Sequence, residues 1–247
     1  MGVLEGKAAL VTGGSRGIGA AIVRRLAADG AVVTFTYMSN ESAAADVVAA
    51  VKTAGGEAIA IQADQADVAA LPEVFARAAE ATGSLDIFVA NAAQVMVKPI
   101  VEVTEDEFDQ LMAANLRGVF FAFQQAGRGL ADNGRIIAIS TLNTAVPDPG
   151  SSLYAGSKGG LEQFVKVAAR EFGERGITVN AVSPGATDTE MLRGANPPEA
   201  LESTPEFTAL GRLGEPTDIA DVVAFLAGPD SRWMTGQNLL ATGGLLI

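Results

Sequence analysis

Two side chains in this sequence have the types and the spacing that proton transfer requires. In the stretch SSLYAGSKGG, residues 151–160, Tyr154 and Lys158 stand four positions apart and would share one face of a helix. A free phenol has a pKa of about 10 and is a poor acid–base group near neutrality, but a nearby ammonium favours the phenolate and lowers that pKa. The pair therefore predicts acid–base chemistry at the tyrosine hydroxyl.

The composition removes most other catalytic chemistries. None of the 247 residues is a cysteine or a histidine. Disulfides, thiolate nucleophiles, zinc sites built on cysteine or histidine and Ser-His-Asp triads are therefore excluded, and we expect no metal site. General acid–base catalysis at neutral pH has to come from tyrosine, lysine, aspartate or glutamate.

The net charge and the hydropathy limit which partners and which cellular compartment the protein can have. The net charge is −12 and no basic patch is visible, so we expect neither nucleic acid nor an anionic membrane as a partner. No stretch approaches the roughly 18 uncharged apolar residues that cross a bilayer. The first eleven residues, MGVLEGKAALV, do not have the pattern of a signal peptide. These observations favour a cytoplasmic protein.

Short apolar runs alternate with longer helical patterns along the chain. Strand-like runs without polar alternation are typical of strands that are buried on both faces. Strict alternation of strands and helices predicts one α/β domain over residues 1–247, with a parallel seven-stranded sheet and helices on both faces. The expected strands are 7–13, 31–37, 57–64, 85–92, 135–140, 177–183 and 238–242, and the expected helices are 17–30, 41–54, 68–82, 104–130, 154–175 and 217–227.

One stretch, residues 187–216, is irregular and rich in Pro, Gly and Glu. Irregular segments of this length are often lids over active sites. Because this one follows the end of a strand, we expect a substrate lid rather than an ordinary surface excursion.

A glycine-rich turn, TGGSRGIG, follows the first strand at residues 12–19. Gly13, Gly17 and Gly19 fall where the strand turns into a helix, and glycine there lets backbone N–H groups approach a diphosphate. A strand, a glycine turn and a helix in this order predict a dinucleotide site.

The end of the second strand separates the two nicotinamide cofactors. NAD sites usually place an acid there to hold the ribose hydroxyls. The strand ends at Tyr37, and Ser39 follows, while the first acid, Glu41, starts the next helix. Arg16 in the glycine turn offers a guanidinium that grips a 2′-phosphate. The sequence therefore favours NADP(H) over NAD(H).

Taken together, the order and spacing of these motifs resemble the short-chain dehydrogenase/reductase family, including its ketoreductases and its 3-oxoacyl carrier-protein reductases. The resemblance covers almost the whole chain and implies a doubly wound, Rossmann-type fold. It implies that Tyr154 gives a proton to a substrate carbonyl while the cofactor gives hydride, and that Lys158 also holds the nicotinamide ribose. The implied catalytic set is Asn115, Ser140, Tyr154 and Lys158.

The resemblance also assigns roles to Ser140 and Asn115 and a set of cofactor contacts. The resemblance implies that Ser140 orients the carbonyl, with its neighbour Thr141 as the rival candidate, and that Asn115 holds a water linking Lys158 to solvent. The implied cofactor contacts are Gly13, Ser15, Arg16, Gly17, Ile18, Gly19, Tyr37, Ser39, Asp64, Gln65, Asn91, Ala92, Ala93, Tyr154, Lys158, Pro184, Gly185, Thr187 and Thr189. The chain departs from the family at residues 90–93, which read Ala-Asn-Ala-Ala where the family often has Asn-Asn-Ala-Gly.

Three functions follow from the resemblance. We expect an NADPH-dependent reductase of a small-molecule ketone; the alternatives are a 3-oxoacyl-[acyl-carrier-protein] reductase and a non-catalytic NADP sensor. Asp132 stands where carrier-dependent relatives commonly have a cation, which disfavours the carrier role. The resemblance also implies a homotetramer, formed through helices 104–130 and 154–175 and the C-terminal strand with its apolar tail, residues 245–247.

Overall fold

All the strands of the central sheet run in the same direction. The computed structural model describes residues 2–80 and 82–245, so the last two residues of the apolar tail lie outside the described part. The sheet has seven strands in the order β3-β2-β1-β4-β5-β6-β7, and each neighbouring pair is parallel. The predicted doubly wound α/β fold is confirmed. The strands are β1 Ala8–Val11, β2 Val32–Tyr37, β3 Glu57–Gln62, β4 Leu85–Ala90, β5 Leu130–Ile139, β6 Thr178–Pro184 and β7 Asn238–Ala241.

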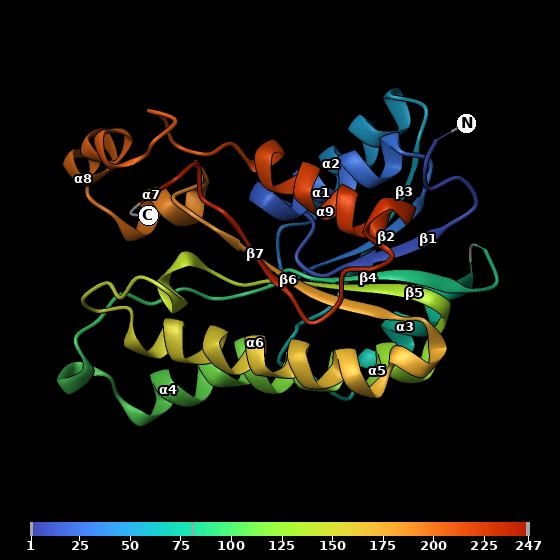
Figure 1. Ribbon diagram of the computed structural model, residues 1–247, viewed down its shortest axis with the longest axis horizontal. Coiled ribbons are helices and arrows are strands. Elements are labelled where there is room, and N and C mark those ends of the chain that lie inside the picture. The colour runs from blue at the N-terminus through green and yellow to red at the C-terminus, as the bar shows by residue number, and fades with distance from the viewer. Residues whose placement is uncertain (1, 81, 246–247) are drawn as a thin grey trace.

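Helices cover both faces of the sheet and make two separate cores (Figure 1). One face carries α1 Gly17–Ala28, α2 Glu41–Thr53 and α9 Pro216–Ala227, and the other carries α3 Leu71–Glu80, α5 Gly118–Gly129 and α6 Ser152–Glu171. Successive side chains of a strand point to opposite faces. Val11 therefore joins the first core, and its neighbour Leu10 joins the second. This explains why the strands read as unbroken apolar runs.

The helix expected over residues 104–130 is divided by a π-helical segment. It consists of α4 Glu105–Met112, the π-helix Ala113–Arg117 and then α5. Thr104 begins it with a capping box, since its hydroxyl accepts from the Glu107 N–H and the Glu107 carboxylate accepts from the Thr104 N–H. Bulges of this kind recur at functional sites, and this one contains Asn115.

The stretch 187–216 is more regular than its composition predicts. It contains α7 Glu190–Ala195, α8 Pro198–Ser203 and a 3₁₀ turn, Thr204–Phe207. The Thr189 side chain caps α7, and a proline opens α8. Helices of six residues are too short to show a 3.6-residue period. Both lie beyond the carboxyl ends of the strands (Figure 1).

Other boundaries differ by a few residues. The third helix starts at Leu71 instead of 68, because the Asp67 carboxylate accepts from the Ala69 N–H and holds a turn before it. The fifth strand starts at Leu130 instead of 135. The remaining 3₁₀ turns are Ile100–Glu102, Leu142–Thr144, Gly173–Arg175 and Pro229–Ser231.

None of the helices in residues 2–80 and 82–245 combines the length and the apolarity that crossing a bilayer takes. The longest, α6, has 20 residues.

Candidate active site

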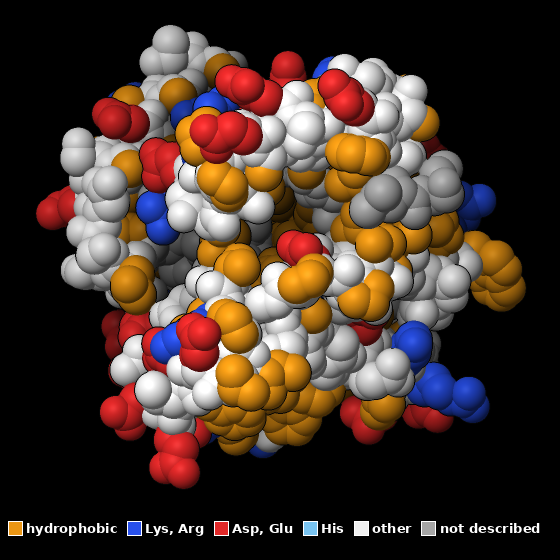
Figure 2. Space-filling model, turned by 90° about the vertical axis from the view of Figure 1, so that its left-hand side faces the viewer, with side chains coloured by type: hydrophobic (Ala, Val, Ile, Leu, Met, Phe, Trp, Pro, Cys, Tyr) orange, Lys and Arg blue, Asp and Glu red, His pale blue; other side chains and the backbone are white. Residues whose placement is uncertain are grey.

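The predicted site residues gather at the carboxyl edge of the sheet, where the molecule is hollowed (Figure 2). In doubly wound sheets, ligands bind at this edge, at the point where the strand order reverses. Here the reversal lies between β1 and β4. The glycine turn follows β1, and Asn91 follows β4.

The glycines of this turn stand where a side chain would be strained or would clash with the backbone. Gly13 and Gly17 have φ values of +68° and +53°, in the left-handed region. A Cβ added at Gly19 would lie 2.1 Å from the Gly13 carbonyl oxygen. Helix α1 starts at Gly17 without a side-chain cap from Arg16, so the N–H groups of its first turn stay available to an anion. A dinucleotide diphosphate fits this turn.

Asn91 pins the glycine turn to the end of β4. Its Nδ2 donates to the carbonyl oxygens of Thr12 and Gly13 at 2.9 and 3.0 Å. The Thr12 hydroxyl accepts from the N–H groups of Asn91 and Ala92 at 3.1 and 3.0 Å. The side chain of Asn91 thus shapes the turn from within the protein. Thr12, which is buried, completes this contact, and the sequence analysis did not single it out.

The end of β2 is free of carboxylates, as the sequence predicted. Tyr37 is half-buried and Ser39 exposed. Asn40 caps α2 by accepting from the Ala43 N–H at 3.0 Å, and Glu41 is the first residue of that helix. An exposed serine and a helix cap at this position suit a phosphate better than they suit bare ribose hydroxyls.

Arg16 faces the first helix of the 187–216 segment. Its guanidinium lies 3.2 Å from the Glu190 carboxylate, and both side chains are more than two-thirds exposed. An ion pair this exposed contributes little to stability, so Arg16 can exchange Glu190 for a phosphate at small cost. The methyl group of Thr189 lies against Gly17, where an added Cβ would be 3.3 Å away.

The remaining expected contacts lie on loops at the same edge. The Asp64 carboxylate accepts from the Ala66 N–H at 2.9 Å. The Gln65 carbonyl packs against Gly118, and its buried Nε2 has no hydrogen-bond partner within residues 2–80 and 82–245. Pro184 ends β6; Gly185 accepts from the Thr187 hydroxyl at 3.1 Å. Ser15, Ile18 and Ala93 are partly buried.

Lys158 is a buried cation on α6. Its side chain is 1% exposed, and its Nζ donates to the Ile139 carbonyl oxygen at 2.7 Å. Burial lowers the pKa of Lys158 to about 8, and the opposing charge of Glu162 limits this fall. The Ile139 contact is its one hydrogen bond within the described chain, so two of its three donors stay free for a ligand.

Burial also governs Tyr154, and here the sequence prediction was wrong. The pKa of Tyr154 is raised, because desolvation of the phenolate outweighs the hydrogen bond to Thr141 that lowers it. The expected lowering by Lys158 is not among the causes of this pKa shift. Tyr154 is therefore protonated at neutral pH, which is the form that gives a proton.

The structure favours Thr141 over Ser140 as the partner of Tyr154, against the first choice from sequence. Thr141 is the side chain that lowers the pKa of Tyr154, whereas Ser140 donates from Oγ to Glu162 Oε1 at 2.6 Å. Both residues follow β5 directly, and successive side chains of extended chain point in opposite directions. Only one of two neighbours can then face the tyrosine.

Asn115 acts as a clamp between the π-helix and the loop after β4. Its Oδ1 accepts from the Gln94 N–H at 2.8 Å, and its Nδ2 donates to the Gln94 carbonyl oxygen at 2.7 Å and to Ser157 Oγ at 3.2 Å. The side chain is fully buried. Because Ser157 precedes Lys158, the clamp reaches the helix segment that contains Lys158; the predicted water contact stays a prediction.

The doubly wound sheet, the glycine turn and the partly buried Tyr154 one turn from the buried Lys158 are together the features of an oxidoreductase. Residues 13–246 match the family model described as enoyl-(acyl carrier protein) reductase. An uncharacterized oxidoreductase of Methylorubrum extorquens is 43% identical over 250 residues, covering 99% of this chain and 100% of that protein.

Solved structures agree with this assignment. A short chain dehydrogenase from Burkholderia cenocepacia in complex with NADP is 44% identical, with a TM-score of 0.93 and 99% of both chains covered. The angucycline C-6 ketoreductase LanV with bound NADP is 41% identical, with a TM-score of 0.93, covering 99% of this chain and 97% of LanV. This chain belongs to the short-chain dehydrogenase/reductase family.

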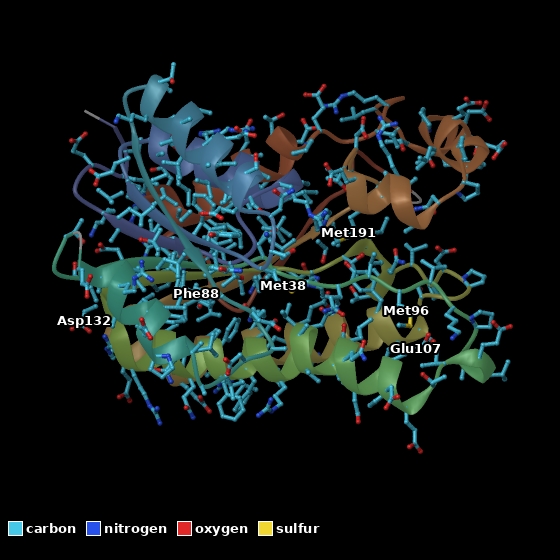
Figure 3. All side chains as sticks on the ribbon, turned by 180° about the vertical axis from the view of Figure 1, so that it is seen from behind. Met38, Phe88, Met96, Glu107, Asp132 and Met191 are labelled. Atoms are coloured by element: carbon cyan, nitrogen blue, oxygen red, sulfur yellow. The ribbon has the colours of Figure 1, made fainter. Side chains whose placement is uncertain are left out.

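Asp132, the acid that stands where carrier-dependent relatives commonly have a cation, does not line this cleft. Asp132 lies at the opposite end of the molecule from Met96 and Met191 (Figure 3), and its carboxylate pairs with Arg175 Nε at 2.8 Å. The charge of Asp132 therefore does not disfavour the docking of a carrier protein at this chain's cleft.

Proposed function

We propose that this protein is an NADPH-dependent carbonyl reductase that acts on free, apolar ketones. The observation that carries the proposal is the protonated Tyr154, which interacts with Thr141 and lies one helical turn from the buried Lys158, at the switch point of the sheet. Two relatives of known structure bind NADP. The same cofactor is supported here by the exposed Arg16 of the glycine turn and by a β2 end without carboxylates.

When bound, NADPH supplies hydride to the carbonyl carbon. The glycine turn would hold the diphosphate, Arg16 the 2′-phosphate, and the free donors of Lys158 the ribose hydroxyls. Thr141 orients the substrate by donating a hydrogen bond to the carbonyl oxygen. Tyr154 gives its proton to that same oxygen. Lys158, held by the Ile139 carbonyl, keeps a positive charge near Tyr154 and so stabilises the phenolate left behind.

The rim of the cleft supports an uncharged substrate. Exposed apolar side chains belong to the loops and short helices at this edge: Val97, Ile100, Val101, Met191, Phe207 and Leu210. Figure 2 shows orange side chains along much of the hollow, with acidic surface at part of its edge. The nearby cations Arg193 and Lys98 are paired with Asp188 and Glu107 at 2.7 and 2.8 Å. We propose that α7 and α8 form a lid over a neutral, apolar ketone.

A screen of ketones for NADPH consumption tests this function. We expect turnover of aliphatic or aromatic ketones without a carboxylate, with NADPH giving a higher kcat/KM than NADH. An absence of turnover across the panel, or a preference for NADH, would contradict the proposal. A protein that binds NADPH without any turnover would instead be the NADP sensor that the sequence left as a distant alternative.

A carrier-protein reductase is the second candidate, favoured by the description of the matching family model. Carrier proteins are acidic, and a chain of net charge −12 repels them at long range. The comparison is kcat/KM for a 3-oxoacyl group on carrier protein against the same group on a short thioester. A carrier advantage of ~10²-fold that falls as salt rises would establish the carrier role.

We also infer self-association into a homotetramer through the outer faces of α4, α5 and α6. Phe108, Phe120 and Val167 are exposed there, and the Phe120 and Phe164 rings meet at 5.2 Å. An apolar face of this kind suits a second copy of the chain. Light scattering on the wild type and on Phe120→Glu tests it: we expect a tetramer that dissociates in the variant. A wild-type monomer would refute it.

A further inference from the structure

Glu162 lies on the same face of α6 as the two residues that carry the proposed chemistry. Tyr154, Lys158 and Glu162 are spaced by four residues each, so they succeed one another along one side of the helix. Glu162 is partly buried. It belongs to none of the motifs singled out in the sequence, and the proposed mechanism does not use it.

One oxygen of Glu162 ties together both ends of the turn that presents Thr141. Its Oε1 accepts from Ser140 Oγ at 2.6 Å and from Thr144 Oγ1 at 2.7 Å. The Thr144 hydroxyl also lies 2.9 Å from the Thr141 carbonyl oxygen, and Thr141 Oγ1 accepts from the Asn143 N–H at 3.3 Å. Thr141 is thus enclosed by two residues that are anchored on the same carboxylate atom.

The same carboxylate is the counter-charge of the buried lysine. The hydrogen-bond acceptor of Lys158 is a neutral carbonyl, so its charge has little compensation from direct contacts. A carboxylate one turn away supplies it. We propose that Glu162 is a positioning residue of this active site: it fixes Thr141 against Tyr154 and keeps Lys158 charged. This inference rests on the proposed function for its catalytic consequence, but not for its effect on Lys158.

The charges around α6 single out Glu162. The elements packed against this helix are β6, the π-helix, α4, the 3₁₀ turn 142–144, α5 and the 3₁₀ turn 173–175. Neither β6 nor the turn 142–144 contains a charged residue. The others contain Glu105, Asp106, Glu107, Asp109, Arg117, Arg128, Glu174 and Arg175. Within the described chain, Glu162 is the charged group that shifts the pKa of Lys158, and it raises that pKa.

Two variants separate the two roles. Glu162→Gln keeps a side-chain oxygen that accepts from Ser140 and Thr144, but it removes the charge. We expect kcat/KM of this variant to fall off on the basic side at a pH about one unit lower than in the wild type. At pH 6 the loss of kcat/KM relative to the wild type should be smaller than at basic pH. Glu162→Ala removes both the contacts and the charge, and we expect at least ~10-fold lower kcat at every pH. The control is Glu171→Gln, an exposed glutamate on the same helix, which should match the wild type.

A readout without turnover keeps this test independent of the proposed function. Unfolding temperature against pH reports the proton on Lys158, because the folded state releases that proton at a lower pH than the unfolded state does. In Glu162→Gln the rise of stability with pH should begin at lower pH than in the wild type and in Glu171→Gln. The inference fails if both Glu162 variants match the control in the unfolding curves and in the rate profiles. If only ketone turnover is absent, the proposed function fails and the effect on Lys158 stands.

Discussion

The hydroxyl of Ser140 donates to Glu162 Oε1 at 2.6 Å, whereas the side chain of its neighbour Thr141 interacts with Tyr154 and lowers the pKa of that phenol. The two hydroxyls at the end of β5 therefore have different partners. Thr141 faces Tyr154, the proposed proton donor, and Ser140 holds the turn in place. A family resemblance read from sequence alone does not separate them.

The first prediction concerns this pair of hydroxyls. Thr141→Ala removes the donor that orients the carbonyl, and we expect kcat/KM for a ketone to fall by ~10-fold or more, the value of one lost hydrogen bond. Thr141→Ser should keep most of the activity. Ser140→Ala should lose less than Thr141→Ala, because Thr144 still donates to Glu162. If Ser140→Ala loses more kcat/KM than Thr141→Ala, Ser140 and not Thr141 orients the carbonyl.

The second prediction concerns the cofactor. Arg16→Ala should raise KM for NADPH by ~10-fold or more and leave KM for NADH nearly unchanged, because a charge-assisted contact to phosphate contributes about 1.5–3 kcal/mol. Arg24→Ala, an exposed arginine on the same helix, is the matched control. Equal effects of Arg16→Ala on both cofactors would show that Arg16 does not bind the 2′-phosphate.

The third prediction is that Lys158 lowers the stability of the fold. The pKa of Lys158 falls from 10.5 to about 8 on folding, so the folded state releases the proton first as pH rises. Below pH 8 the cost of the buried charge is fully present, and between pH 8 and 10.5 it is progressively relieved. Lys158→Met should therefore raise the free energy of unfolding at pH 7 by about 2–3 kcal/mol while abolishing activity.

Thermal unfolding between pH 7 and 10 measures this effect. Wild type should gain stability over that range relative to Lys158→Met, whose curve should be flatter. Lys166→Met, an exposed lysine of the same helix, should follow the wild type. A Lys158→Met protein that is less stable than the wild type at pH 7 would mean that the contact to Ile139 outweighs the cost of burying the charge.

Much of this architecture could be predicted from the sequence, because strands buried on both faces read as apolar runs and the helices between them keep a 3.6-residue period. The glycine turn could be predicted too, since glycine adopts the left-handed φ of Gly13 and Gly17 without steric cost. The short helices α7 and α8 escaped prediction because six residues do not show a period.

The features of the site that the sequence did not predict correctly share one physical cause: they depend on the folded arrangement of the chain. The direction of the Ser140 and Thr141 side chains depends on how β5 ends, which the composition of the segment does not encode. The pKa of Tyr154 depends on burial by residues far away in the chain. Glu162 became visible only when folding brought it to Ser140, 22 positions earlier.

The central claim is that Tyr154 gives the proton to the substrate carbonyl, and Tyr154→Phe tests it most directly. The substitution removes one oxygen and keeps the ring, so folding and NADPH binding should be preserved, as measured by unfolding temperature and by fluorescence titration of NADPH. Steady-state kcat for ketone reduction should fall by at least ~10²-fold. If the variant binds NADPH normally and retains most of its kcat, Tyr154 is not the proton donor and the proposed mechanism is wrong.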